Sequence, residues 1–363
     1  MKITVNQKNL KKALNLVEKI VSKNTSLPIL NNILLKTENG RLKVSATNLE
    51  IGINYIIGAK IEEVGQIAVP ARIISDFIGN IVDDKVSLTT KNNILNVNSE
   101  RYKTQILGFD AKDFPIIPKI KSTPLAVIPA KLLRNSLMTV LDSVAISETR
   151  PELAGVFMDF NNDKIVFAAT DSFRLTEKSV DFKNIEKQSF IIPRNTVVEL
   201  IRIAGDLEGD MVFSTSDNQI SFFNDDFEMV SRIVDGNYPD YKKVIPEKCI
   251  SRVLIKKDEL DKTIRIAGLF SSNISDIRIN CLEGKMAVLA KNSDKGEIET
   301  LVDASLKNQP FEVSLNFHYL LDGLKVLDTE KVVIEFTGQG SPLVIRPNDD
   351  RKDMVYLIMP LRN

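Results

Sequence analysis

The chain has 363 residues, and its 48 basic side chains balance 48 acidic ones. This neutrality argues against a protein that grips DNA at one site by neutralising many phosphates. The length suits two or three folded domains, and a hydrophobic content of 43% gives no sign of a disordered chain. Residues 1–6 alternate polar and apolar residues instead of forming a signal peptide, and no apolar run would span a bilayer. We therefore expect a cytoplasmic protein without a membrane partner.

Each third of the sequence opens with a short strand that runs into an amphipathic helix. The three copies lie at residues 3–21, 127–144 and 254–270. After each strand, apolar residues recur every three or four positions, which is the spacing of one buried helix face. Leu10, Leu133 and Leu260 occupy equivalent positions in these helices. The sequence therefore predicts an internal repeat of about one third of the chain.

A second strand-to-helix unit follows within each third. These units lie at residues 67–78, 190–201 and 311–321. Pro70 and Pro193 stand where strand gives way to helix, at the first turn, where the missing N–H of proline costs nothing. Strand-like runs separated by turn residues follow each helix. The sequence thus predicts three copies of a twofold plan in which one strand, one helix and three strands succeed one another.

Polar, proline-marked segments separate the copies. They lie at residues 118–124 and 246–249 and predict three domains at 1–120, 121–248 and 249–363. Six short helices among many antiparallel strands predict an α+β fold of three topologically similar domains. In such a fold the helices cover one face of a continuous sheet, and the other face meets solvent.

The sequence carries little catalytic equipment. Its one histidine, His318, lies in an amphipathic run without cysteine or spaced acidic partners, so we expect it on a helix surface or in packing. No nucleophile elbow, phosphate-binding loop or zinc motif occurs. The paired aspartates at 83–84, 225–226 and 349–350 suit turns better than a metal site. We expect no catalytic residue, no metal and no cofactor.

Two other patterns leave alternatives open. Cys249 and Cys281 are too few for a disulfide framework, and each lies in or beside a strand-like stretch where a buried structural thiol is usual. Asp171 and Arg174 would fit an enzyme with a polar site. The repeat by itself would also fit a scaffold that binds proteins without DNA.

Seven segments match one known family, in order and at the family's spacing. They are MKITV (1–5), LPILNNILL (27–35), ATNLE (46–50), SETRP (147–151), ATDSFRL (169–175), VDGNYPDY (234–241) and YLIMPLR (356–362). With them, the whole chain resembles the beta subunit of bacterial DNA polymerase III, the beta sliding clamp. The resemblance implies two three-domain protomers joined head to tail in a ring, with helices lining the hole and antiparallel sheets outside.

The resemblance also implies the partners. Such a ring encircles double-stranded DNA without regard to sequence and confers processivity by tethering the DNA polymerase III catalytic subunit. The clamp loader, other DNA polymerases and repair proteins bind it through short peptide motifs. Neutral overall charge suits this mode, because many strong phosphate contacts would hinder sliding.

A DNA-facing wall is implied by the same resemblance. The residues expected to face DNA are Lys8, Lys12, Lys23, Asn24, Lys131, Arg134, Arg150 and Lys257. Most belong to the first helix of a copy, where a diffuse basic surface attracts phosphate. Without the resemblance, these side chains would equally well belong to ordinary solvated helix faces.

An apolar pocket for short extended peptides is implied between the second and third domains. The matching positions are Leu153, Thr170, Ser172, Phe173, Arg174, Leu175, Pro239, Lys243, Val244, Asn316, Tyr319, Pro342, Ile358, Met359, Pro360, Leu361 and Arg362. Apolar side chains would form a deformable floor, with Arg174 and Arg362 at the rim for peptide carbonyls or carboxylates. On pattern alone, Phe173 and Leu175 would be strand core and 359–361 a terminal strand. Ser172-Phe173 and Asn363 depart from the family pattern, so we expect a different peptide preference.

Leu269 and Phe270 match the apolar part of the family's dimer interface. A head-to-tail contact joins two different surfaces, and it gives a ring only if the rotation closes after two copies. The alternative is that both side chains belong to the core of the third domain.

Overall fold

The structure is a computed structural model that describes residues 1–21, 27–120, 122–147, 149–161, 163–182, 187–216, 218–349 and 351–361. Within these residues the order of elements repeats the predicted plan six times. The first copy comprises β1 (Lys2–Asn6), α1 (Gln7–Glu18), β2 (Asn32–Glu38), β3 (Arg41–Thr47), β4 (Ile51–Glu63), β5 (Gln66–Pro70), α2 (Ala71–Asn80), β6 (Lys85–Lys91), β7 (Ile94–Asn98) and β8 (Lys103–Leu107). The second comprises β9 (Ala126–Pro129), α3 (Ala130–Leu141), β10 (Gly155–Asn161), β11 (Lys164–Thr170), β12 (Arg174–Asp181), β13 (Gln188–Pro193), α4 (Arg194–Asp206), β14 (Asp210–Ser216), β15 (Gln219–Phe223) and β16 (Phe227–Arg232). The third comprises β17 (Ser251–Lys256), α5 (Lys257–Gly268), β18 (Asp276–Leu282), β19 (Lys285–Asn292), β20 (Gly296–Asn308), β21 (Phe311–Asn316), α6 (Phe317–Lys325), β22 (Lys331–Phe336), β23 (Leu343–Pro347) and β24 (Met354–Ile358).

The predicted α+β class and the three similar copies are confirmed.

Local chemistry sets the helix starts. The Asn6 side chain accepts a hydrogen bond from the Asn9 N–H at 3.2 Å, and the Asn316 side chain caps α6 in the same way. Pro70 and Pro193 are the last residues of β5 and β13, one position before the helices that they were predicted to begin. In the described part of the chain, four short 3-10 turns lie in the connections: η1 (Pro28–Asn31), η2 (Ala111–Asp113), η3 (Pro151–Leu153) and η4 (Tyr241–Val244).

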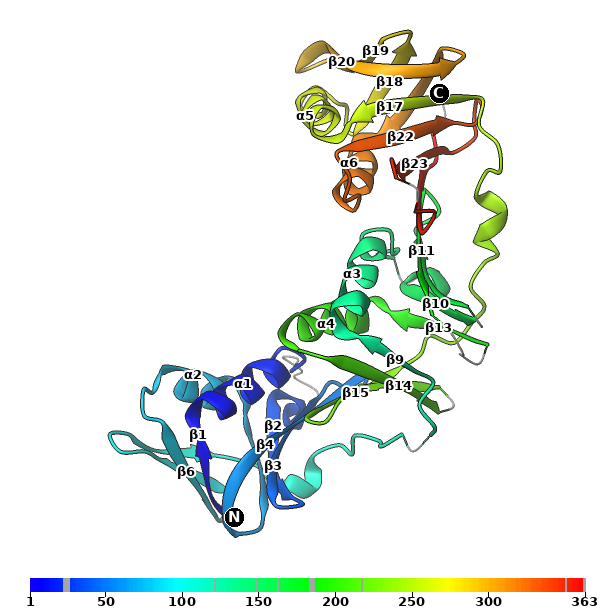
Figure 1. Ribbon diagram of the computed structural model, residues 1–363. Coiled ribbons are helices and arrows are strands. Elements are labelled where there is room, and N and C mark those ends of the chain that lie inside the picture. The colour runs from blue at the N-terminus through cyan, green and yellow to red at the C-terminus, as the bar shows by residue number, and fades with distance from the viewer. Residues whose placement is uncertain are drawn as a thin grey trace. The chain divides into compact units, whose positions relative to one another are not determined.

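The chain forms two compact units, each built on one twelve-stranded antiparallel sheet (Figure 1). Unit 1 comprises Met1–Leu132 and Arg202–Ile233, and unit 2 comprises Leu133–Ile201 and Val234–Asn363. Each sheet joins strands of two sequence copies. In unit 1, β4 pairs with β16, and in unit 2, β12 pairs with β24.

Helices lie against one face of each sheet. In unit 1, α1 packs on α2 and on strands β3 and β4, and in unit 2, α5 packs on α6 and on β19 and β20 (Figure 1). The strand pattern agrees with this layering. Along β20, Val302 and Ala304 face the core, whereas Glu297 and Glu299 are exposed on the other side.

The two cysteines differ. Cys281 lies fully buried in the core of unit 2, and burial raises the pKa of its thiol to about 11. Cys249 is exposed, so the expectation of a buried thiol is wrong for it. It stands between η4 and β17, outside any strand that would carry it into the core.

Among the helices of the described residues, none is long and apolar enough to cross a membrane.

Candidate functional site

A cavity of about 240 Å³ opens in unit 2 where the end of β11, the start of β12 and the end of β24 meet η3 and η4. We call it the β12–β24 pocket. Eight residues assigned to a peptide pocket from the sequence line it: Leu153, Thr170, Ser172, Arg174, Leu175, Pro239, Val244 and Met359. Four further lining residues were not expected there: Arg150, Asp240, Tyr241 and Leu357.

The turn between β11 and β12 forms the rim of the pocket and is fixed by its own side chains. The Thr170 hydroxyl donates to the Arg174 carbonyl at 2.7 Å and accepts from the Ser172 N–H at 3.1 Å. One Asp171 oxygen accepts from the N–H groups of Phe173 and Arg174, both at 2.9 Å. These bonds hold Ser172 at a positive φ of 78°, a conformation that L-residues avoid. The Phe173 side chain is therefore presented to solvent, 59% exposed.

Arg174 lines the pocket and is only 11% exposed. Its Nε donates to Asp171 at 3.0 Å, its Nη1 donates to Asp322 of α6, and its guanidinium lies 4.5 Å from the ring centroid of Tyr319. Burial works to lower the pKa of Arg174, but Tyr356 and these carboxylates outweigh it, and the pKa is raised. Asp171 and Arg174, the pair considered as an alternative catalytic site, are thus bound to each other and to the fold.

Charged groups border the open side of the pocket. Arg150 donates to Glu152 at 3.0 Å and to the Ser172 hydroxyl at 3.2 Å. The N–H of Glu152 and the Arg150 guanidinium hold the pKa of the Glu152 carboxyl below its ordinary value. Lys243 pairs with Asp240 at 2.9 Å. The rim therefore combines paired charges with the exposed side chains of Phe173 and Val244.

An aromatic cluster supports the far wall. Phe157 stacks on Tyr238 with centroids 4.8 Å apart, and Tyr241 meets both rings edge-on. The Tyr241 hydroxyl donates to Glu177 at 2.6 Å, and burial raises the pKa of this phenol. These contacts fix η4, which brings Val244 to the pocket.

The remaining predicted pocket residues lie on neighbouring elements. Asn316 caps α6, and the carbonyl of Tyr319 accepts from the Tyr356 hydroxyl at 2.7 Å. Ile358 is buried opposite Arg174 in the β12–β24 pair. The Pro342 carbonyl accepts from Thr337 at 2.6 Å, and Pro360 follows Met359, whose N–H donates to the Phe173 carbonyl at 2.7 Å. Arg362 and Asn363 lie outside the described residues.

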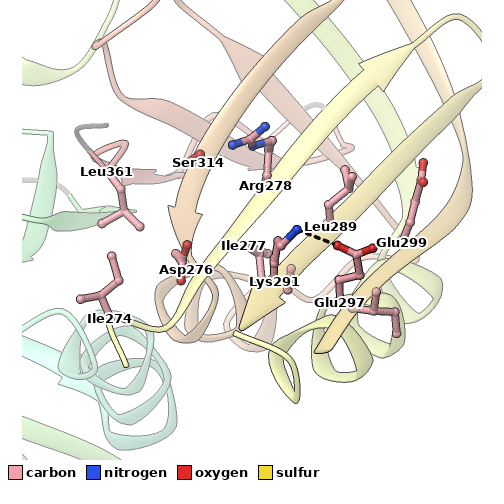
Figure 2. Close-up of a pocket in the computed structure, with 12 residues that line it drawn as sticks. Ile274, Asp276, Ile277, Arg278, Leu289, Lys291, Glu297, Glu299, Ser314 and Leu361 are labelled. Carbon is pink, nitrogen blue, oxygen red and sulfur yellow. Dashed lines mark ion pairs between the residues drawn. The ribbon is translucent and has the colours of Figure 1, made fainter. Parts of the chain in front are cut away.

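Leu361 borders a different cavity, of about 510 Å³, on the third copy in unit 2. Figure 2 shows its side chain and that of Ile274 pointing toward one another at one end of this cavity. At the other end Lys291 pairs with Glu297 at 3.0 Å. Met359 and Leu361, two residues apart, therefore line two separate cavities.

The residues predicted to face DNA fall into several groups. Lys8 and Lys12 border a basic groove of about 430 Å³ in unit 1 with Lys11 and Arg202. Lys131 is exposed and Arg134 is half-buried. Arg150 lies at the β12–β24 pocket, and the Lys257 ammonium donates to the Leu327 carbonyl at 2.9 Å. Lys23 and Asn24 lie outside the described residues.

Leu269 and Phe270 follow α5 directly. Leu269 is 67% exposed, whereas Phe270 packs against the core of unit 2. Phe270 thus agrees in part with the core alternative and Leu269 does not, and the assignment of both residues to a dimer interface stays a prediction.

The described residues contain no group of three or more histidine, cysteine, aspartate or glutamate side chains placed to hold a metal ion. His318 is exposed in the first turn of α6, with its ring 3.9 Å from that of Phe317. The β12–β24 pocket combines apolar side chains with paired charges at its rim, an arrangement that suits recognition of an apolar side chain.

Three family models match the chain. They describe the N-terminal domain of the DNA polymerase III beta subunit over residues 1–118, its central domain over 127–240 and its C-terminal domain over 242–362. The beta sliding clamp of Vibrio cholerae is 28% identical over the whole of both chains. The beta sliding clamp of Synechocystis is 26% identical over all of this chain and 99% of that relative.

Solved structures agree with these matches. The DNA polymerase III subunit beta of Pseudomonas aeruginosa is 27% identical over the whole of both chains, with a TM-score of 0.96. The beta subunit of Thermotoga maritima is 26% identical over all of this chain and 99% of that one, with a TM-score of 0.94. A P. aeruginosa sliding clamp bound to griselimycin is 26% identical over the whole of both chains, with a TM-score of 0.94.

Proposed function

Since the chain belongs to the DNA polymerase III beta subunit family, we propose that two copies join head to tail in a ring around double-stranded DNA. Membership makes the protein a DNA sliding clamp, a non-catalytic processivity factor built of three clamp domains. We place the domain boundaries at 1–120, 121–248 and 249–363; the first boundary lies between two family models, and the third model begins seven residues before the boundary at 249. The observation that carries the proposal is the threefold repeat, matched along its full length to known clamps.

Two different surfaces support a head-to-tail contact. On the third copy, Leu269 and Ile274 are both more than 60% exposed. On the first copy, β8 is an edge strand of its sheet, and its Leu107 is 72% exposed. Free strand edges and exposed apolar side chains both favour association. A head-to-tail contact joins two unlike surfaces and is therefore heterologous. Two such contacts between two chains would close a ring.

The inner wall is assigned to the helices. The groove beside α1 combines Lys8, Lys11, Lys12 and Arg202 with a single carboxylate, that of Asp206. Such a surface attracts the phosphate backbone without reading bases, which suits sliding. Because its DNA lies there, we place the clamp in the bacterial cytoplasm.

The β12–β24 pocket is assigned to partner peptides. Its lining of leucine, proline, valine and methionine beside exposed Phe173 suits a short extended segment with an aliphatic anchor. We assign to it peptides of the DNA polymerase III catalytic subunit, the clamp loader, other polymerases and repair proteins. Since griselimycin is bound to the P. aeruginosa clamp, competition between griselimycin and a polymerase peptide is a direct check of shared sites.

Encirclement is tested by topology. The purified clamp is loaded by its cognate clamp loader onto nicked circular DNA, and retention is measured before and after linearisation. We expect release from linear DNA only, together with a solution mass near twice the 40.7 kDa of the chain. Leu269→Asp is expected to lower the mass toward one chain, whereas Leu282→Asp, at another exposed leucine of the third copy, leaves it unchanged. Equal retention on circular and linear DNA would contradict the ring.

A further inference from the structure

Two turns of the chain share one hydrogen-bond pattern. In the β3–β4 turn, the Thr47 hydroxyl donates to the Ile51 carbonyl at 2.9 Å and accepts from the Leu49 N–H at 3.1 Å. Asn48 accepts from the next two N–H groups at 3.0 and 2.8 Å. Leu49 has a φ of 75°, close to the 78° of its counterpart Ser172. These are the bonds that Thr170 and Asp171 make in the β11–β12 turn, so the turn forms from a threonine and an Asx residue alone.

What differs is the residue that ends the turn. Ile51 is a buried apolar residue in the first copy, and Arg174 stands at the same position in the second. The turn does not require an arginine, because Ile51 serves equally. The guanidinium binds Asp171 within the turn and extends beyond it to Asp322 and the ring of Tyr319, both on α6. Arg174 therefore joins the pocket rim to a helix 148 residues away in sequence.

We propose that Arg174 is a positioning residue that fixes the rim turn to α6 and so sets the place of Ser172 and Phe173 over the β12–β24 pocket. The inference rests on the proposed peptide-binding function. It assigns to Arg174 a different role from the rim arginine that grips peptide carbonyls. The direct polar contact then falls to Arg150, which is exposed and lines the same pocket.

Burial of Arg174 makes its ion pairs costly to break. Removing one member of a largely buried ion pair leaves the other without compensation, whereas an exposed pair contributes little. The planar fork of arginine serves Asp171 and Asp322 at the same time, and lysine has no such geometry. Asp322 is a third exposed and is absent from the pocket lining, so its effect on peptide binding can pass only through Arg174 and α6.

The first test measures binding of a fluorescently labelled peptide from the cognate DNA polymerase III catalytic subunit by anisotropy. We expect Asp322→Asn and Arg174→Lys each to weaken binding about tenfold, and the double variant to be no weaker than the worse single variant. Asp171→Asn restores the residue of the first turn and is expected to have a smaller effect. Glu335→Gln, which breaks the Arg346–Glu335 pair at 3.0 Å away from the pocket lining, is the matched control and should not alter binding. Unchanged affinity in Asp322→Asn would overturn the proposal, as would weakening by Arg174→Lys alone.

A second test needs no peptide. The chain contains no tryptophan, so Phe173→Trp places a single reporter on the rim. We expect the anisotropy of Trp emission to fall when Asp322→Asn or Arg174→Lys is added, because the rim turn gains freedom, and to be unaffected by Glu335→Gln. Equal anisotropy in all four proteins would contradict a tether. If the labelled peptide fails to bind the unaltered chain, the proposed function fails, and this reporter still decides the role of Arg174.

Discussion

Among the described residues, a strand of one sequence copy pairs with a strand of the next at two places, which we call seams, and the cavities at these seams differ in their side chains at equivalent positions. The backbone frames agree. At the β4–β16 seam the Arg232 N–H donates to the Glu50 carbonyl at 3.1 Å, and at the β12–β24 seam the Met359 N–H donates to the Phe173 carbonyl at 2.7 Å. A cavity of about 240 Å³ lies at each seam.

The side chains on these frames differ. The β4–β16 cavity is lined by Glu50, Gln219 and Arg232 together with apolar residues such as Leu49, Ile116 and Val230, and the connecting segment packs Ile117 against Gly52. At the other seam, Met359 replaces Arg232 and Phe173 replaces Glu50. The two seams share the same backbone arrangement. The apolar side chains of Phe173 and Met359, which stand where the β4–β16 seam has charged ones, make the β12–β24 seam a candidate peptide site.

The largest effect is expected where the two seams are packed differently. Gly52 corresponds to the buried Leu175, and a Cβ at Gly52 would lie 2.7 Å from Cγ2 of Ile117. Gly52→Leu should therefore displace Ile117 and cost about 2–3 kcal/mol of stability, measured by calorimetric unfolding. Adding Ile117→Ala should recover part of the loss, because the two sites are coupled. If the stability losses of the two substitutions simply added, Ile117 would not be the residue that Gly52→Leu displaces.

A smaller effect is expected at the threonines of the two turns. Thr47→Val and Thr170→Val each remove a hydroxyl that makes two hydrogen bonds, at a cost of about 1–2 kcal/mol. Calorimetry should give similar losses for both, whereas only Thr170→Val should weaken binding of the polymerase peptide. Weaker peptide binding by Thr47→Val would contradict the assignment of the peptide site to the β12–β24 seam alone.

The smallest effect is expected for the dependence of stability on pH. Glu152 belongs to the second seam only, and its folded pKa is lowered by its own N–H and by Arg150. A lowered carboxyl pKa stabilises the fold above the unfolded value of about 4.3, and this contribution is lost as pH falls through the folded pKa. The difference in unfolding temperature between the unaltered chain and Glu152→Gln should shrink from pH 5 to pH 3. A constant difference would show that the carboxylate is not held in the folded state.

The repeat was readable from the sequence because helix and strand periodicities are local. Leu10, Leu133 and Leu260, assigned to equivalent helix positions, are all fully buried. The segments quoted for the family resemblance also contain Thr47 and Thr170 at the same phase. A threonine followed by an Asx residue is a local signal that marks both turns in the sequence.

Local sequence patterns could not predict which strands pair at the seams, or that Arg174 binds Asp322. β4 pairs with β16 through contacts such as Tyr55 with Phe227, and sequence periodicity carries no information on which distant edges meet. Asp322 was missed for the same reason, since it lies in a helical pattern with no local sign of its partner. Tyr241 and Leu357 lie in the segments quoted for the family resemblance but were not assigned to the pocket, and only the fold brings them there.

The most direct test of the difference between the seams exchanges one residue. The labelled peptide from the DNA polymerase III catalytic subunit is titrated against the unaltered chain, Met359→Arg and Arg232→Met, with affinity read by anisotropy. We expect Met359→Arg to weaken binding at least about tenfold, because it brings a charge into the apolar pocket, and Arg232→Met to leave binding unchanged. Full affinity in Met359→Arg, or a comparable loss in Arg232→Met, would contradict the assignment of the β12–β24 pocket as the peptide site.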